Sequence, residues 1–242
     1  MSLRSAVGLV VLGVALGTGG CDDAPPTTKP KPPAAAAEGE GKKVKVGDNV
    51  HLEVSPKARR VLVEAVVCLR EGALEQLLTR KNQKEHEAIL AADVDARKVH
   101  EALLLAKAEA GSPVRWVPKY RPPTGSTIKV SLVYTDAKGK KVTVPARSWI
   151  KNRSTGKELE HDWVFAGSLL IDNPQDKNAA KYYLANDGDV ICVANFEGAM
   201  LDLPIQSSKD DADRAYDAWT ERIPPVGTKV TVVLEPVEGK RK

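Results

Sequence analysis

Apolar and polar side chains alternate along residues 61–69, and this run gives the strongest element signal in the chain. One face of the run is wholly apolar and carries Val61, Val63, Ala65, Val67 and Leu69. Successive side chains of a strand point to opposite sides, so these five share one face. The other face mixes apolar and polar groups. The pattern predicts a strand near the middle of a sheet, buried on one face and partly covered on the other.

A turn follows this strand, and the next segments are extended or helical. Gly72 accepts a positive φ, which lets the chain reverse after Glu71. Residues 73–80 are predicted to return as a strand, although an apolar run of that length also fits a helix. Residues 86–91 are predicted to form a short helix.

Two longer helices are predicted from apolar positions spaced by three and four residues. The first has the stripe Ala96, Val99, Leu103 and Ala106, with Asp93 or Asp95 as its N-cap. The second begins at Ser207 or Ser208, with Asp210 or Asp211 completing a capping box. Its buried stripe is predicted to comprise Ala212, Ala215, Tyr216, Trp219 and Ile223.

Further extended segments outnumber these helices. Residues 127–135 and 141–144 are predicted to form a hairpin, and residues 189–194 and 228–234 are predicted strands. Connections between successive strands are short, and strands and helices do not alternate regularly. The predicted fold class is α+β, a mainly antiparallel β-sheet with two principal helices packed on it.

The first residues have the layout of an export signal. Arg4 precedes an apolar stretch at residues 6–16, and small residues then lead to Cys21. This order is typical of a lipoprotein signal peptide over residues 1–20, with Cys21 as the lipid attachment site. A plain signal peptide with an unrelated cysteine is the alternative. Acylation would anchor the protein to a membrane without a spanning helix.

Composition divides the rest of the chain. Residues 21–43 are rich in Pro, Ala, Lys and Gly, and predict a disordered tether that follows the lipidated cysteine. Residues 44–238 are predicted to form a single α+β domain, and residues 239–242 a basic tail. The net charge of +4 is spread along the chain. We therefore expect no nucleic-acid partner, because such binding needs a concentrated basic face.

Four long segments occur in order along the domain: CLREGALEQLL, KEHEAILAADVDARKVHEALL, HDWVFAGS and GDVICVANFEGAMLDLP. Together they resemble the YdjY domain family of bacterial envelope proteins, and the resemblance covers about residues 44–236. The resemblance implies an envelope location and names no activity. A ferredoxin-like label attached to the family implies an iron–sulfur centre, which needs several clustered cysteines that this chain lacks.

Two cysteines remain once Cys21 is assigned to lipid. Cys68 and Cys192 both lie in apolar predicted strands. We favour two buried, reduced thiols, while a disulfide between them is the alternative in an oxidising compartment. A nucleophilic Cys68, with Arg70 and His86 as neighbours, is a weaker hypothesis.

The histidines suggest one candidate metal site. His86 and Glu87 begin the predicted short helix, and His161 begins a strand that carries aromatic side chains. If the fold brings His86, Glu87 and His161 together, they would hold a divalent metal such as zinc. The competing prediction is that the protein has no cofactor and that these histidines are structural.

Basic and aromatic residues are interleaved in two places. Trp116, Tyr120 and Trp149 lie near Arg115, Lys119, Arg121 and Arg147. Such a set would line a ligand or glycan surface through stacking and cation–π contacts, although packing in the core and at its edge also explains it.

The sequence predicts a lipid-anchored cell-envelope protein that faces the periplasm and acts as a non-enzymatic binding or accessory module. The sequence is compatible with attachment to either the inner or the outer membrane. Its predicted partners are the membrane, through the N-terminal lipid, and an envelope protein or small ligand. The alternative is a metal-dependent or redox accessory protein with its site around His86, Glu87 and His161.

Overall fold

Eight strands close into a barrel. The computed structural model describes residues 41–176, 178–205 and 215–237. Around the barrel the strands are β3 (Arg59–Val67), β16 (Lys229–Pro236), β7 (Thr127–Thr135), β10 (Trp163–Phe165), β14 (Leu201–Asp202), β13 (Ile191–Cys192), β5 (Gln76–Arg80) and β6 (Ala88–Ala92). Pairing of β6 with β3 closes the ring. Two of the pairings, β13–β14 and β5–β6, are parallel.

The two nine-residue strands make closure possible, because each one pairs with two neighbours along the same edge. The first half of β3 pairs with β2 (Val50–Val54), and its last residues pair with β6. In the same way β7 pairs first with β10 and then with β8 (Lys141–Pro145). β1 (Lys42–Gly47) pairs with β2 and lies outside the barrel.

The inward faces of β3, β16 and β7 meet in register. Val63 lies opposite Val232, and Val232 lies opposite Leu132; all three side chains are fully buried. The neighbouring row joins Val61, Leu234 and Val130 in the same way. On the other face Thr231 donates to the Glu64 carboxylate. The alternating pattern of residues 61–69 is therefore confirmed as one core face and one partly exposed face.

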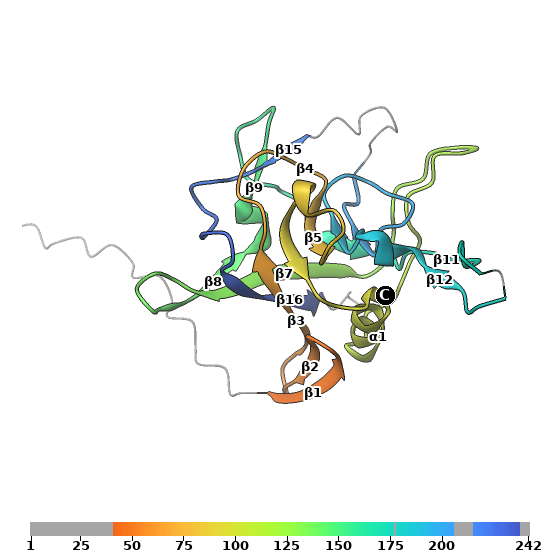
Figure 1. Cartoon of the computed structure of the whole chain (residues 1–242), viewed down its shortest axis with the longest axis horizontal. Coiled ribbons are helices and arrows are strands. Elements are labelled where there is room, and N and C mark those ends of the chain that lie inside the picture. The colour runs from red at the N-terminus through yellow and green to blue at the C-terminus, as the bar shows by residue number, and fades with distance from the viewer. Residues whose placement is uncertain (1–40, 177, 206–214, 238–242) are drawn as a thin grey trace, which may run out of the picture. The chain divides into compact units, whose positions relative to one another are not determined.

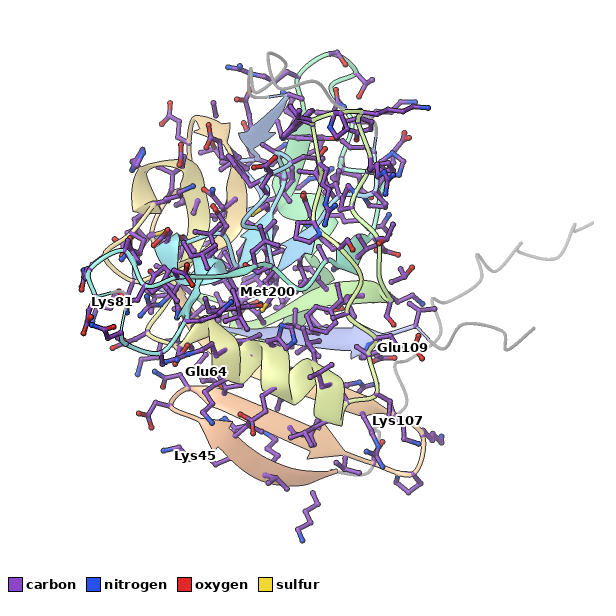
Figure 2. The ribbon with its side chains drawn as sticks, turned by 90° about the vertical axis from the view of Figure 1, so that its right-hand side faces the viewer. Lys45, Glu64, Lys81, Lys107, Glu109 and Met200 are labelled. Carbon is purple, nitrogen blue, oxygen red and sulfur yellow. The ribbon has the colours of Figure 1, made fainter. Side chains whose placement is uncertain are left out.

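One α-helix occurs in the described residues, α1 (Ala96–Leu105). Asp95 is its N-cap and accepts from the Arg97 amide at 2.9 Å, and the Ala96 amide donates to Asn186 Oδ1 at 2.9 Å. Val99 and Leu103 are fully buried, as the stripe predicted. Figure 2 shows α1 between the β1–β2 hairpin and the barrel, with Lys107 just beyond its end.

Short elements surround the barrel. A three-stranded sheet contains β4 (Ala73–Leu74), β15 (Tyr216–Ala218) and β9 (Ile150–Asn152), and a two-stranded sheet contains β11 (Leu170–Ile171) and β12 (Tyr182–Tyr183). The 3₁₀ helices are η1 (Glu85–Glu87), η2 (Ala146–Trp149) and η3 (Leu184–Asp187). No helix within the described ranges is long and apolar enough to cross a bilayer.

The predicted α+β class is wrong. The described residues form a mostly β structure in which the sheet closes on itself, and α1 is the one principal helix rather than the first of two. The second predicted helix is wrong over the part of it that the structure describes. Tyr216 lies in strand β15, and residues 219 to Ile223 form irregular turns. Residues 206–214, which include its predicted cap at Ser207 or Ser208, lie outside the described residues.

Two segments between β3 and α1 also differ from prediction. Residues 86–91 were predicted as a helix, but they hold the end of η1 and most of β6. All five residues of β6 are buried, and a strand that is buried on both faces has a continuous apolar sequence without alternation. Residues 73–80 are extended, as predicted, yet they do not return along β3; β5 pairs with β6 and β13.

The barrel needs no residue ahead of β1. The predicted leader, Cys21 and the tether up to residue 40 lie outside the described residues, whereas Lys42 and Lys43 belong to β1 rather than to the tether. Every strand of the closed ring falls between Arg59 and Pro236. A fragment of residues 39–242 therefore contains the complete core.

Replacing Val63 by Ala should destabilise this fragment by about 2–3 kcal/mol, because it leaves a cavity where β3, β16 and β7 meet. Val66→Ala is the matched control. Val66 lies on the same strand but is 40% exposed, so its loss should change stability by less than about 1 kcal/mol. Urea unfolding of both variants measures the difference. Equal effects would contradict the assignment of the two faces.

Candidate functional site

A group of buried and part-buried polar side chains lies at one side of the barrel, where β5, β13 and β14 adjoin. This interior polar cluster consists of Gln76, Lys84, Asp189, Asn195 and Asp202. Its members come from strands and from the loops beside them. The sequence segments that carry Lys84 and Asp189 lie more than a hundred residues apart, and the barrel brings them together.

Asp189 is the acceptor at the centre of this cluster. Lys84 Nζ donates to Asp189 Oδ1 at 2.7 Å, and Gln76 Nε2 donates to the same oxygen at 3.3 Å. Gly188 places Asp189 here, because it has a φ of +116° and a Cβ at that position would lie 2.7 Å from Thr79 Oγ1. Among the described residues Gln76 Oε1 has no hydrogen-bond partner, and a buried acceptor of this kind is ordinarily satisfied by water.

Lys84 is held in its charged form. Burial alone would lower the pKa of Lys84, but the hydrogen bond from Lys84 to Asp189 and the charge of that carboxylate outweigh burial and raise the pKa. The ammonium group also lies over the Phe196 ring, 4.6 Å from its centroid. Lys84 therefore joins two loops electrostatically.

Asp202 differs from Asp189 because no cation lies beside it among the described residues. Asn195 Nδ2 and the Leu203 amide each donate to Asp202 Oδ1 at 2.8 Å. Burial raises the pKa of Asp202 to about 8, although these hydrogen bonds lower it, and the charge of Asp189 adds to the rise. Asp202 is therefore a largely protonated acid at neutral pH that secures the loop between β13 and β14.

The two cysteines are free thiols. Cys68 Sγ donates to the Ala88 carbonyl, and Cys192 is fully buried. Strands β6 and β5 lie between the two cysteines in the order of hydrogen-bonded neighbours, which makes three spacings of ~4.8 Å. Measured along the sheet, the cysteines are roughly 14 Å apart and beyond disulfide reach. Burial raises the pKa of Cys68 to about 12 and raises that of Cys192 well above its usual value. Both thiols are protonated, which opposes the nucleophile hypothesis for Cys68.

The structure brings only two of the three predicted metal ligands together. His86 Nε2 lies 3.7 Å from Glu87 Oε2, and the His86 side chain is 76% exposed. His161 is an exposed residue ahead of β10, and the part of the chain that the structure describes contains no group of three His, Cys, Asp or Glu side chains placed to hold one ion. The metal site at His86, Glu87 and His161 therefore stays a prediction, and the described residues do not group these three side chains around one position.

A different histidine is built into the fold. His100 Nδ1 lies 2.8 Å from the Tyr183 hydroxyl, which donates to the Gly167 carbonyl at 3.0 Å. Burial lowers the pKa of His100. The imidazole also packs edge-on against Phe165, so His100 connects α1 to the strand β10.

Residues 111–125 form a long arm between α1 and β7, which we call the 111–125 arm. It is the yellow-green loop that extends beyond the strands in Figure 1. Arg115 and Arg121 exchange backbone hydrogen bonds of 3.0 and 2.8 Å across it. The Trp116 and Tyr120 rings pair with centroids 5.4 Å apart, and the Tyr120 hydroxyl donates to the Ile205 carbonyl at 2.7 Å.

The arm contains most of the basic and aromatic set that the sequence suggested as a binding surface, but not all of it. Trp149 is 1% exposed and packs against Tyr134 in the core. Arg147 pairs with Asp162 at 3.3 Å. The binding-surface interpretation therefore applies to the arm alone.

A surface hollow offers a second feature for a small ligand. It has a volume of about 380 Å³ and lies between the turn of the β7–β8 hairpin and residues 221–228. Apolar Ile223 and Pro225 share its lining with Asp136 and Arg222. Arg222 is already stacked on Trp219 at 3.5 Å and paired with Glu158, so its charge is not directed into the hollow alone.

Sequence reasoning missed the interior polar cluster, although one signal was present. Asp189 and Asp202 bracket an apolar stretch, VICVANFEGAML, and a carboxylate beside such a stretch is carried into the interior with it. Lys84 and Gln76, the partners of Asp189, could not be identified from sequence, because β5 meets β13 only when the barrel closes.

The family comparison covers most of the chain. A family model described as YdjY domain matches residues 39–235. No curated protein and no solved structure matches the chain. The match includes the whole barrel, α1, the interior polar cluster and the 111–125 arm.

Replacing Lys84 by Met should destabilise residues 39–242 by about 1–3 kcal/mol, because it leaves the Asp189 carboxylate buried without its cation. The pair Lys45–Asp48 provides the control, since both of its side chains are solvent-exposed. Lys45→Met should cause no measurable change. Urea midpoints of the two variants compare them, and equal midpoints would show that the buried pair has no special role.

Asp202→Asn should remove part of the pH dependence of stability. The pKa of Asp202 is raised in the folded state, so its contribution is fully present below the unfolded pKa of about 4 and is lost as pH rises towards about 8. Wild-type stability should therefore fall, relative to Asp202→Asn, between those two pH values. Urea unfolding at intervals across this pH range measures how the free energy of unfolding of each protein changes with pH. The same change with pH in wild type and Asp202→Asn would contradict a protonated Asp202.

Proposed function

The chain belongs to the YdjY domain family, and from that premise we propose that it is a lipid-anchored accessory module of the bacterial cell envelope. In this proposal Cys21 carries the lipid and residues 22–40 form the tether. The barrel faces the periplasm and binds its partner through the 111–125 arm. The proposed activity is recognition without catalysis.

The anchoring proposal is supported by the position of Cys21 relative to the fold. The first strand begins at Lys42, and the barrel and its core are complete from there onward. Cleavage before Cys21 and acylation of its side chain therefore remove or alter nothing that the barrel uses. A Pro-rich segment of this length would let the barrel stand off from the membrane or approach it, at ~3 Å per residue.

The single observation that carries the binding proposal is the 111–125 arm. It places three basic residues, Arg115, Lys119 and Arg121, on a segment that extends from the barrel and is exposed at these positions. By contrast, the charges of the interior polar cluster are engaged with one another, as in the 2.7 Å contact of Lys84 with Asp189. Exposed cations on a projecting element are available to a partner, whereas buried paired ones hold the fold together.

A metal-dependent or redox accessory role at His86, Glu87 and His161 is the alternative hypothesis. Its geometric support is the contact of His86 with Glu87. The arm is favoured because its basic and aromatic groups already lie together within the described residues.

Cys21→Ser in the full chain should release the protein from membranes, because the thioether-linked lipid can no longer form. Cell fractionation with a high-salt wash measures anchoring separately from electrostatic adhesion, and incorporation of labelled fatty acid reports acylation directly. Cys68→Ser is the matched control and should stay membrane-bound and labelled. Retention of Cys21→Ser through the salt wash, or an unlabelled wild type, would contradict lipid anchoring.

A further inference from the structure

The tip of the 111–125 arm has exposed apolar residues with basic residues on either side of them. Val117 is 79% exposed, more than any other large apolar side chain in the described residues, and Pro118 beside it is exposed as well. Arg115, Lys119 and Arg121 flank this tip and are all exposed. Within the described part of the chain, none of these three has an acidic side chain as an ion-pair partner. The arm therefore presents apolar surface and exposed positive charge together.

The arm is held in place although its tip is exposed. Val114 at its root is 1% exposed, and the Gly111 amide donates to the Phe165 carbonyl at 2.9 Å. Gly125 closes the root with a φ of +139°, where a Cβ would lie 2.1 Å from the Phe165 carbonyl oxygen. Any other residue would push the arm off β10. A fixed root means that little conformational entropy is lost when the tip binds.

We propose that the tip of the 111–125 arm docks on the anionic surface of a phospholipid bilayer. Val117 and Pro118 enter the headgroup region, and the guanidinium and ammonium groups around them contact lipid phosphates. This deepens the proposed function, because it rests on the arm as the binding element and names what the arm binds. The lipid at Cys21 would supply the first attachment and the arm a second, weaker one that fixes how the barrel faces the membrane.

Charge and ring geometry favour a bilayer over a glycan. An anionic leaflet attracts each nearby basic residue and accepts an apolar point between its headgroups. A sugar site stacks on a ring face, and the Trp116 and Tyr120 rings already pair with each other, with centroids 5.4 Å apart and a 49° tilt. Aromatic rings in this position suit the interface between headgroups and acyl chains.

The test uses residues 39–242, which lack Cys21 and contain the complete barrel. Co-sedimentation should show binding to vesicles containing phosphatidylglycerol and not to pure phosphatidylcholine, and binding should weaken as salt is added. Arg115→Glu together with Arg121→Glu should reduce binding roughly 30-fold or more, because each basic residue near an anionic surface contributes about fivefold. Val117→Asp should abolish the blue shift of Trp116 emission on vesicles, with Trp116→Phe identifying that signal.

Lys138→Glu together with Lys140→Glu is the matched control. These residues are exposed on the β7–β8 turn, and their reversal changes the net charge by the same amount. Binding that survives in this control and is lost in the arm variant supports docking through the arm. Equal losses, failure to bind anionic vesicles at low salt, or arm-dependent binding to soluble glycan fragments in place of vesicles would each overturn it. Because the fragment lacks Cys21, these results are independent of whether the full chain is acylated.

Discussion

Val63, Val232 and Leu132 lie side by side on three neighbouring strands, and this buried row determines how the rest of the barrel is arranged. It fixes the register of β3, β16 and β7, since a slip by one residue would expose every inward side chain of the strand that moved. With that register set, the free ends of β3 and β7 are positioned to pair with β6 and β10. The closed ring then brings Lys84 to Asp189, and the Phe165 carbonyl to the glycines at the root of the arm.

Polar groups divide into two kinds according to where this ring places them. Inside, Lys84 and Asp189 compensate each other, and Asp202 is satisfied by Asn195 and backbone amides. Outside, the basic residues of the arm are exposed beside an apolar tip. In the proposed function, stability and recognition depend on different residues, so substitutions in the arm should leave the core undisturbed.

Local patterns in the sequence predicted the elements that depend on interactions between residues close in the chain. Alternation identified β3, β7 and β8, and the stripe with its Asp95 cap identified α1. The errors arose where pairing between distant segments decided the outcome. β6 was mistaken for a helix because both of its faces are buried, which removes the alternation that marks a strand. The capping-box pattern near Ser207 did not prevent Tyr216 from joining β4 and β9. The basic and aromatic residues of the arm were identified, whereas Trp149 was wrongly grouped with them because its burial depends on tertiary contacts.

The central claim is that a rigid barrel presents the 111–125 arm to a bilayer. Hydrogen exchange of residues 39–242, with and without vesicles that contain phosphatidylglycerol, tests it most directly. The account predicts that β3, β16 and β7 exchange slowly in both conditions, and that new protection appears in the tip between Arg115 and Arg121. Protection gained instead around the hollow at Ile223 or across the interior polar cluster, with the tip unchanged, would contradict it.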